Sequence, residues 1–448
     1  MLNFFFKRND FLGGVKVREY KELSEHKPLT KAPIPKRVLR PYIQHNLVRI
    51  KPTIEVGATV KVGTKIGDPE GRISVPMHAS ISGKVTKLED IEHPVLPARA
   101  PTCIIESDGV DLWEDYIKER DYSNLSKEEL LETIRDAGIV GLGGAAFPTH
   151  IKLSPPKDKV IDTVIINGCE CEPFITCDHQ LMLEKSEEII EGARIIAKIL
   201  SVNKVIFAIE DNKPDAIDKM KKALGNSNCY IVAKLKTKYP QGAEKQLIKT
   251  LLNRTVPQGG LPFDVGVVVQ NVGTTFAIYE ACRYRKPLIE RVVTVTGNGV
   301  KEPKNLWVRI GTPVYEIIEF CGGYTDEPGK LILGGPMTGV AQYTDDIPVL
   351  KGTSGIVVFK KSELKKLGSE LSPEYDCIRC ARCIMACPMQ LQPTLLNSYI
   401  KKRDFLSAKQ NNVLDCIECG CCAYVCPARI KLVHAFVHAK REIKRLNL

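Results

Sequence analysis

The sequence predicts a multidomain α/β protein of four consecutive units, and three features of the chain indicate it. The N-terminal quarter has short apolar runs interrupted by glycine and proline, which is typical of small β-domains. The middle alternates strand-like and helix-like segments, the pattern of an α/β layer structure. The C-terminal part concentrates cysteine in two closely spaced runs. With 448 residues, the chain can give each unit its own core.

The first unit, residues 1–110, is expected to form a flattened barrel. Its segment VRIKPTIEVGATVKVGTKIGDPEGRISVPMHASISGKVTKL has short strands separated by glycines. This pattern resembles the biotinyl/lipoyl hammerhead, a barrel-sandwich hybrid fold that carries a modifiable lysine at a hairpin tip. The expected tip here, residues 68–72, reads DPEGR and has no lysine. A docking or structural role is therefore expected in place of a swinging arm.

The second unit, residues 111–288, is expected to be a Rossmann-like α/β domain. Ser126 and Glu129 fit a capping box, which opens a helix that stops at Gly138. Strand-like VIDTVIING, VIFAIE, YIVAKLK and DVGVVVQ then alternate with helices expected at 214–224, near 243–253 and from about residue 275. Such alternation predicts a largely parallel sheet.

The last two units differ sharply in composition. Residues 289–362 are again β-rich, with RVVTVTGNGV and KLILGGPMTGV, and are expected to form a β-grasp (SLBB-like) module. Residues 363–448 combine the cysteine runs with helical connectors and end in a predicted amphipathic helix with a basic face.

The cysteine runs read CIRCARCIMACP and CIECGCCAYVCP, and both follow C-x2-C-x2-C-x3-C-P. This is the bacterial ferredoxin spacing for a pair of [4Fe–4S] clusters, in which the fourth cysteine of each run binds the other cluster. A ferredoxin-type 2[4Fe-4S] domain is therefore expected. The ligands expected for one cluster are Cys377, Cys380, Cys383 and Cys426, and those for the other are Cys387, Cys416, Cys419 and Cys422.

Zinc and disulfides are the alternatives for these cysteines. A zinc site needs only four ligands and lacks the trailing x3-C-P, and nothing in the sequence indicates an oxidising compartment. The additional Cys421 is expected to be a small buried thiol beside a cluster.

The net charge and the hydropathy of the chain limit the kinds of partner that it can bind. The chain has a formal charge of +11, and residues 397–448 hold ten Lys/Arg against four Asp/Glu. A basic surface suits an acidic redox partner or an anionic membrane face, and no nucleic-acid module accompanies it. No apolar run approaches the roughly 20 residues of a membrane span. We expect reduced thiols in a cytoplasm, without a signal peptide, and Phe4–Phe6 or the C-terminal helix as membrane contacts.

Four loops of the second unit have the character of a ligand site. The run GLGGAAFPTHIK, residues 141–152, has three glycines that let a phosphate approach the backbone, and Lys152 adds a positive charge. NGCECEP (167–173) and QNVGT (270–274) follow predicted strands, and YPQGAE (239–244) opens a predicted helix. Open α/β sheets bind ligands at such positions.

These loops resemble those of the flavin- and NADH-binding subunit of respiratory complex I. GLGGAAFPTHIKL is similar to its GxGGAGFPTGxKW-like loop, NGCECEP to NADESEP, YPQGAEKQL to YxxGEETAL, and QNVGT to NNVET. The order of all four agrees. With the hammerhead before them and the two cysteine runs after them, the whole chain resembles the RnfC family, the C subunits of Rnf electron transport complexes.

The resemblance implies a bound FMN with NAD(H) stacked over it. Hydride then passes directly between nicotinamide and flavin, so no catalytic side chain is expected. Phe147 matches an aromatic residue near the dinucleotide, and Glu172 an acidic residue close to the NADH ribose or amide. The residues implied for the flavin pocket are Gly141, Gly143, Gly144, Lys152, Asn167, Glu170, Tyr239, Gly242, Glu244, Gln270 and Asn271.

The chain also departs from the complex I pattern. Leu142 replaces an arginine, Cys169 an aspartate and Cys171 a serine, so the flavin hydrogen bonds are expected to differ. Cys169, Cys171 and Cys177 are expected to be buried thiols that shape the pocket, with a redox or metal site as the alternative.

The function implied is that of a peripheral NAD(H)-reacting subunit on the cytoplasmic side of a membrane-bound, ion-translocating ferredoxin:NAD+ oxidoreductase. It would pass electrons between the two clusters and NAD(H) through FMN. The implied partners are the ferredoxin-like B subunit, the membrane-bound A, D, E and G subunits, and, indirectly, ferredoxin. One alternative is a soluble cobalamin reductase, in which the hammerhead-like domain follows the clusters. The other is a flavin-free relay or docking protein, which intact glycines at 141–144 disfavour.

Overall fold

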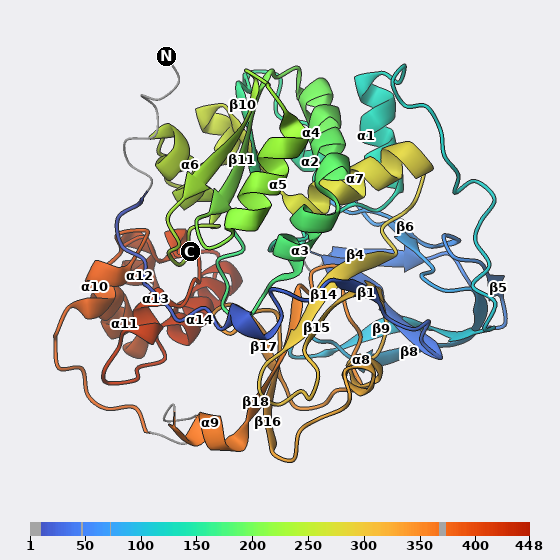
Figure 1. Cartoon of the computed structure of the whole chain (residues 1–448). Helices are drawn as coiled ribbons and strands as arrows, with labels where there is room; N and C mark the ends of the chain where they lie inside the picture. The colour runs from blue at the N-terminus through green and yellow to red at the C-terminus, as the bar shows by residue number, and fades with distance from the viewer. Residues whose placement is uncertain (1–9, 46–47, 72, 367–372) are drawn as a thin grey trace.

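The structure is a computed structural model that describes residues 10–45, 48–71, 73–366 and 373–448. Arg72 of the expected hairpin tip and the aromatic run at 4–6 lie outside the described residues. Figure 1 shows an α/β layer above a β-rich base, with the helical C-terminal unit beside both. Among the described residues, no helix has the length and apolar character needed to cross a bilayer.

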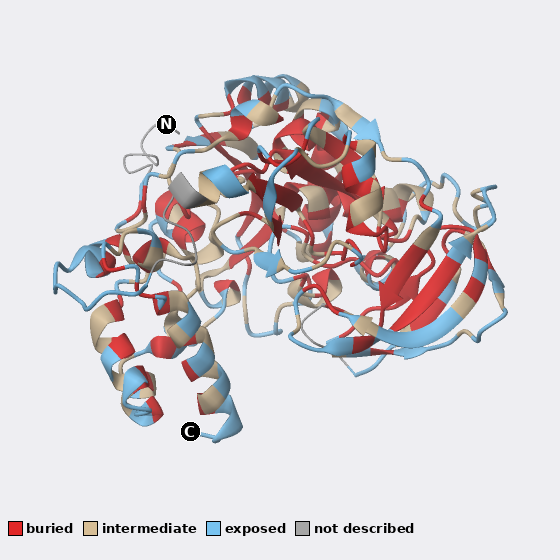
Figure 2. Ribbon diagram, turned by 90° about the horizontal axis from the view of Figure 1, so that it is seen from below, coloured by how far each residue is buried: buried red, intermediate tan, exposed pale blue. Residues whose placement is uncertain are grey.

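The first unit has two four-stranded sheets whose paired strands are all antiparallel. One sheet has the order β2 (Arg37–Pro41), β9 (Arg99–Ser107), β8 (Gly83–Glu92), β5 (Thr59–Val60). The other has the order β3 (Ile43–His45), β4 (Val48–Pro52), β6 (Lys65–Pro69), β7 (Met77–His78). Fully buried side chains such as Ile66, Met77 and Ile105 form its core. Figure 2 shows that its strands carry both buried and exposed residues.

Residues 10–28, here called the N-terminal strap, run outside this barrel. The amide of Gly14 donates to the carbonyl of Ala386 (2.9 Å), and the amide of Phe174 donates to the carbonyl of Glu19 (2.7 Å). The strap includes a short 3₁₀ helix, η2 (Lys21–Leu23), and leads into β1 (Leu29–Lys31), which pairs in parallel with β15 (Lys304–Arg309). One segment therefore links three other parts of the chain.

The second unit contains a four-stranded, entirely parallel sheet, which confirms the parallel sheet that the sequence predicts. Its order is β12 (Tyr230–Leu235), β11 (Lys204–Glu210), β10 (Thr163–Asn167), β13 (Val267–Asn271). The associated helices are α1 (Lys127–Asp136), α2 (Thr149–Lys152), α3 (Cys177–Glu184), α4 (Ser186–Leu200), α5 (Pro214–Leu224), α6 (Glu244–Leu252), η3 (Pro262–Val265) and α7 (Val272–Tyr284).

The expected start of α1 is confirmed. The Ser126 hydroxyl accepts from the Glu129 amide (3.2 Å), and the Glu129 carboxylate accepts from the Ser126 amide (2.7 Å). Gly138 follows the helix at φ +68°, a conformation that glycine adopts without strain.

The third unit is a six-stranded mixed sheet completed by the strand from the strap. Its order is β1, β15, β14 (Glu290–Thr296), β18 (Gly355–Lys360), β16 (Pro328–Leu333), β17 (Val340–Gln342). Helix α8 (Val314–Phe320) packs into its core, and α9 (Lys361–Lys366) follows β18.

The fourth unit is helical. Its elements are α10 (Arg382–Ala386), α11 (Pro393–Lys401), α12 (Phe405–Gln410), η4 (Val413–Asp415), α13 (Cys421–Tyr424) and α14 (Leu432–Arg445). In α14 the buried residues Leu432, Phe436, Ala439 and Ile443 share one face, while Arg441, Lys444 and Arg445 are exposed. The predicted amphipathic helix with a basic face is therefore confirmed.

Candidate functional site

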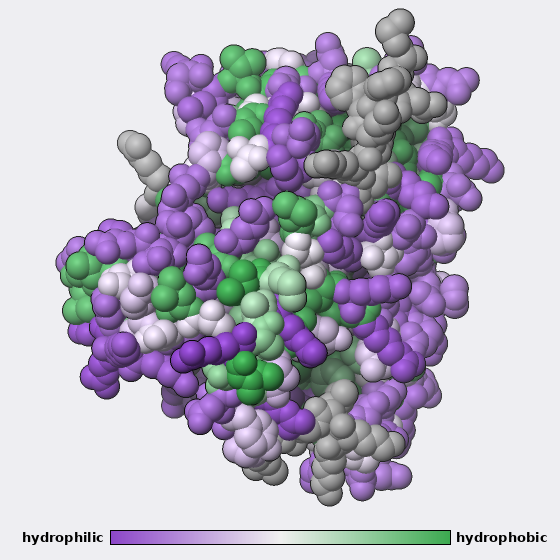
Figure 3. All heavy atoms as spheres, turned by 90° about the vertical axis from the view of Figure 1, so that its left-hand side faces the viewer, coloured by the Kyte–Doolittle hydropathy of each residue, from purple (hydrophilic) through white to green (hydrophobic). Residues whose placement is uncertain are grey.

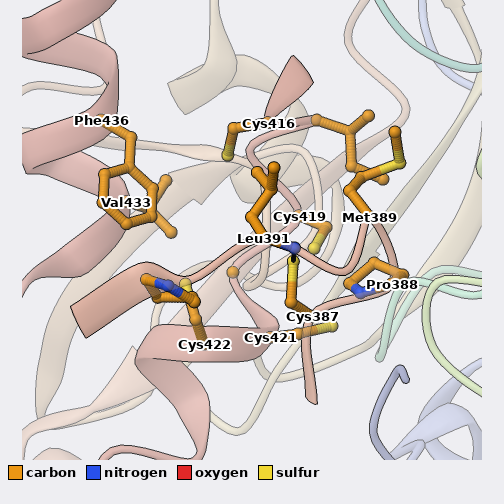
Figure 4. A pocket seen from close by; sticks show the side chains of 13 residues that line it. Cys387, Pro388, Met389, Leu391, Cys416, Cys419, Cys421, Cys422, Val433 and Phe436 are labelled. Carbon is orange, nitrogen blue, oxygen red and sulfur yellow. Dashed lines mark hydrogen bonds between the residues drawn. The ribbon is translucent and has the colours of Figure 1, made fainter. Parts of the chain in front are cut away.

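Five cysteines line one pocket of the helical unit, here called the proximal cysteine pocket (Figure 4). Four of them are the predicted ligands Cys387, Cys416, Cys419 and Cys422, and the fifth is the additional, buried Cys421. Met389, Leu391, Val433 and Phe436 complete an apolar wall. The amide of Leu391 donates to Cys387 Sγ (3.3 Å), and that of Glu418 to Cys416 Sγ (3.4 Å). Amide donors to sulfur stabilise thiolates that bind a cluster.

The other four predicted ligands of the two runs line a second pocket, here called the outer cysteine pocket. They are Cys377, Cys380, Cys383 and Cys426. Cys377 and Cys380 are exposed, whereas none of the proximal four is. Each pocket thus gathers the four thiols that the sequence assigns to one cluster. Four sulfurs in an apolar surround are the donor set of a [4Fe–4S] cluster, so the residues present fit the group.

The carboxyl edge of the parallel sheet brings the predicted flavin loops together. Asn167 and Asn271 end neighbouring strands in register. The Asn167 Nδ2 donates to the carbonyl of Gly242 (2.9 Å), and this bond joins two of the four loops. Asn271 caps α7, since its Oδ1 accepts from the amides of Gly273 (2.8 Å) and Thr274 (3.2 Å).

The glycine-rich loop closes on itself beside this edge. The amide of Gly141 donates to the carbonyl of Phe147 (2.8 Å). Gly143 lies against Asn271, because a Cβ on Gly143 would come within 2.7 Å of the Asn271 Nδ2. Gly144 faces open space, since a Cβ there would meet nothing within 4 Å. Exposed glycines of this kind form a cradle that a flat or phosphorylated ligand can enter.

Two further predicted residues support a polar ligand here. Gln270 is buried, and its Nε2 has no hydrogen-bond partner among the described residues. A buried, unpaired amide donor is costly unless a ligand or water accepts from it. Lys152 Nζ lies 2.5 Å from Glu244 Oε1 and is partly exposed. The residues at this edge therefore fit a flavin phosphate and ring system.

The two acidic residues of the 167–173 loop bind protein groups. Both carboxylate oxygens of Glu170 accept backbone amides at the start of α3, from Asp178 (2.7 Å) and His179 (3.2 Å). Glu172 accepts from the Met337 amide (3.1 Å) and from the Thr338 hydroxyl, so it holds a loop of the third unit.

The thiols of this region are buried. Cys171 Sγ accepts from the amide of Gly242 (3.4 Å), and Cys169 Sγ lies 3.7 Å from the carbonyl of Ala208. Burial raises the pKa of Cys169, Cys171 and Cys177. These observations favour the interpretation that they are neutral thiols that shape the pocket.

Two buried lysines that sequence reasoning missed donate hydrogen bonds to backbone carbonyls of the segment 169–175. Lys21 Nζ, from the strap, donates to the carbonyls of Glu170 (2.9 Å), Glu172 (3.1 Å) and Ile175. Lys213 Nζ donates to the carbonyl of Cys169 (2.6 Å). Lys21 is some 150 residues from its partners in the sequence, so no local motif marks it.

An apolar cluster, here called the junction, lies between the sheet edge and the proximal cysteine pocket. Its members are Val15, Tyr239, Ala386 and Cys421, with Val17, Cys171, Met337, Cys419 and Val425 packed against them. The strap, the flavin loops, the third unit and the cysteine runs each contribute residues to the junction. The junction therefore places packed apolar side chains between the two candidate sites.

Four family models match consecutive parts of the chain. They are the RnfC barrel sandwich hybrid domain (residues 9–110), the Nuo51 FMN-binding domain (134–280), the SLBB domain (292–341) and the 4Fe-4S dicluster domain (371–427). With the geometry above, they define a flavin- and iron–sulfur-carrying electron-transfer subunit of an oxidoreductase.

Similar proteins cover almost the entire chain. The C subunit of the proton-translocating ferredoxin:NAD(+) oxidoreductase complex of Clostridium ljungdahlii is 48% identical, covering 96% of this chain and 93% of that protein. The C subunit of the Na(+)-translocating complex of Acetobacterium woodii is 44% identical (98% and 98%). The C subunit of the ion-translocating oxidoreductase complex of Rhodobacter capsulatus is 41% identical (96% and 82%). The chain belongs to this family, the RnfC family.

Proposed function

We propose that this chain passes electrons between NAD(H) and its two [4Fe–4S] clusters through FMN, as the NAD(H)-reacting subunit of an ion-translocating ferredoxin:NAD+ oxidoreductase. Family membership and the FMN-binding and dicluster domains support this function. The barrel domain precedes the clusters, the opposite of the order in the cobalamin reductase alternative. When bound, FMN exchanges a hydride with NAD(H) and single electrons with a cluster.

The observation that carries this proposal is the junction. Tyr239, which the resemblance places in the flavin pocket, packs in one cluster with Cys419 and Cys421 of the second cysteine run. We therefore assign the proximal cysteine pocket to the cluster that exchanges electrons with the flavin. The outer cysteine pocket, with two exposed cysteines, holds the cluster that exchanges electrons with a partner protein.

The residue roles follow the loops described above. Gly141, Gly143 and Gly144 are assigned to the cradle, and Lys152, Glu244 and the amides of α6 to the phosphate. Gln270, with its unpaired Nε2, and Asn271 are assigned to the ring. Phe147 is half-buried at the end of the glycine loop and is assigned to the dinucleotide. Glu170 and Glu172 hold the pocket's loop. The proposed domains are residues 1–110, 111–288, 289–362 and 363–448.

The ligands of the outer cysteine pocket are flanked in the sequence by residues suited to contact with an acidic protein. Ile378, Met385 and Tyr424 are exposed apolar residues, and Arg379 and Arg382 are exposed cations; we call these five residues the outer face. Figure 3, which views the side of the molecule bearing the helical unit, shows apolar side chains gathered among hydrophilic ones. We assign the outer face to the ferredoxin-like B subunit, since positive charge steers acidic redox proteins.

The chain is one component of a larger complex, as its family membership shows. We propose that it lies peripherally on the cytoplasmic side of the membrane, against the A, D, E and G subunits. The exposed basic face of α14 supports contact with an anionic surface.

An anaerobic NADH titration of the full chain with reconstituted clusters and added FMN tests the function. Bleaching of the bound flavin by NADH, followed by absorbance, is the expected result. Cluster reduction is followed in the same samples by electron paramagnetic resonance. If no flavin binds and NADH changes neither signal, the chain is a relay without a nicotinamide site, and the proposal fails.

A further inference from the structure

A carboxyl group that the proposed function does not use lies behind the flavin pocket. Asp178, the second residue of α3, accepts a hydrogen bond at Oδ2 from the Asn271 Nδ2 (2.6 Å). Its Oδ1 faces Gly273, because a Cβ on that glycine would lie 3.6 Å away from it. Asp178 therefore contacts the N-terminal end of α7, directly behind the glycine-rich loop.

Asp178 has a second carboxyl group as its neighbour. Oxygen atoms of Glu170 and Asp178 lie within 4.8 Å of each other. Both carboxylate oxygens of Glu170 accept backbone amides at the N-terminal end of α3. Asp178 accepts from one side-chain amide, that of Asn271, and is only partly exposed. A neighbouring carboxylate this close favours the protonated form of Asp178.

Among the described residues, three cations lie near the pair, and each also binds other groups. Lys21 Nζ lies 4.0 Å from Glu170 Oε2 and donates to three backbone carbonyls of the same loop. Arg291, on β14, donates to the carbonyls of Val292 (3.2 Å), Lys351 (2.5 Å) and Leu142 (3.2 Å). Lys213 donates to the carbonyl of Cys169 and to the side chains of Asn212 and Glu210. Cys177 beside the pair is a neutral thiol. Burial and the charge of Glu170 outweigh these cations and raise the pKa of Asp178 to about 7.

Asp178 is connected to the proposed flavin pocket through Asn271. The Oδ1 of Asn271 is fixed by the amides of Gly273 and Thr274, and its Nδ2 by Asp178. The same Nδ2 lies against Gly143 of the cradle. A second full negative charge on the pair would pull this amide toward Asp178, whichever flavin is bound, and would in addition repel the phosphate of FMN.

We propose that Asp178 is a positioning residue of the flavin pocket: it holds a proton beside Glu170, and the pocket binds flavin tightly only while that proton is present. The inference rests on the proposed flavin pocket. Above neutral pH, each flavin bound takes up one proton from solvent at this carboxyl pair. Below neutral pH, the proton is already present and binding takes up none.

The test is flavin binding by the full chain with reconstituted clusters, followed anaerobically by fluorescence quenching at pH 6, 7 and 8. FMN and riboflavin are both used, because riboflavin lacks the phosphate, whose own titration also changes FMN affinity. For riboflavin, the wild-type dissociation constant is expected to rise up to about tenfold from pH 6 to pH 8. In Asp178→Asn, a neutral isostere, it is expected to change less than about twofold and to stay near the wild-type pH 6 value.

Asp215→Asn is the matched control. Asp215 is a half-exposed carboxyl that accepts from the His179 ring (2.8 Å), so its loss removes a nearby negative charge without touching the pair. It should keep the wild-type pH dependence. Calorimetry of the wild type at pH 8 in two buffers of different ionisation enthalpy should show proton uptake, a result independent of any variant.

Two outcomes overturn the inference alone: flavin binding with a pH-independent affinity in the wild type, or an unchanged pH dependence in Asp178→Asn. No flavin binding at any pH would overturn the pocket itself and the inference with it.

Discussion

The Sγ atom of Cys421 lies 3.9 Å from the carbonyl oxygen of Tyr239. This contact joins the second cysteine run to a loop of the flavin domain. Tyr239 also forms two backbone hydrogen bonds with Val15. Its amide donates to the Val15 carbonyl (3.0 Å), and its carbonyl accepts from the Val15 amide (2.8 Å). The strap, the flavin loop and the second cysteine run are therefore joined at one residue, Tyr239.

Separate loss of each cluster is the first expected result. Cys419→Ser should remove the proximal cluster and Cys380→Ser the outer one, because each thiol lines only its own pocket. Each variant should keep about four of eight iron atoms. Iron analysis and electron paramagnetic resonance measure this, and NADH should still bleach flavin in both.

The control for the ligand variants is Cys421→Ser, which changes a cysteine that lies in the run but is assigned no iron. It should keep both clusters. Loss of a cluster in this variant, or of both clusters in Cys380→Ser, would contradict the division into two sets.

Lys21 is expected to be essential to the flavin loop. Lys21→Met leaves three carbonyls without their buried donor and removes a cation 4.0 Å from Glu170. Breaking a buried charged contact costs about 3–5 kcal/mol, so thermal stability and FMN affinity should both fall. Lys16→Met, an exposed change in the same strap, is the control for calorimetry and flavin titration. Equal behaviour of the two variants would contradict this role.

The two neighbouring glycines of the cradle should behave differently. In Gly143→Ala the new methyl group meets the Asn271 side chain, so the cap of α7 must move, at a cost of about 1–3 kcal/mol. Gly144→Ala adds a methyl group to open space and should change thermal stability by less than about 0.5 kcal/mol. Flavin affinity should fall in the first variant even where the protein remains folded. Equal melting temperatures for the two variants would show that Asn271 is not held as described.

Local patterns predicted much of this architecture. The capping box at Ser126, the helix at 214–224 and the parallel strands follow from short-range rules, and the structure confirms them. The cysteine spacing also separated the two sets that line the two pockets. The family comparisons confirm the order of the domains.

These short-range rules do not predict contacts between residues that are far apart in the sequence. The strap carries no regular pattern, yet Lys21 and β1 join units far along the chain. Glu172 accepts hydrogen bonds from Met337 and Thr338 of the third unit, contacts that its match to the dinucleotide motif does not reveal. Asp178 has no motif of its own, and its significance comes from Glu170 and Asn271, which only the fold brings to it.

The outer face should control the rate of electron exchange with an acidic partner. Arg379→Glu with Arg382→Glu should slow electron transfer from a reduced ferredoxin-like protein at least about tenfold at low salt, and the difference should shrink at high salt. The control is Lys219→Glu with Lys222→Glu, which changes two exposed lysines of α5 and alters the net charge equally, away from the outer face. Stopped-flow measurement of the rate of cluster reduction compares the two double variants. If both pairs slow the reaction equally, net charge and not the outer face steers the partner.

The carboxyl of Asp178 should also leave a signature in the pH dependence of stability. Its pKa of about 7 in the folded protein lies well above the unfolded value near 3.9. Between these values the folded state binds the proton and the unfolded state does not, so the free energy of unfolding falls as pH rises from 4 to 7. Asp178→Asn removes this titration and should gain roughly 2–4 kcal/mol over wild type between pH 4 and pH 8. Melting temperatures of both proteins across this range measure the gain, which should be absent in Asp215→Asn. A constant difference between Asp178→Asn and wild type at every pH would mean that Asp178 is ionised throughout.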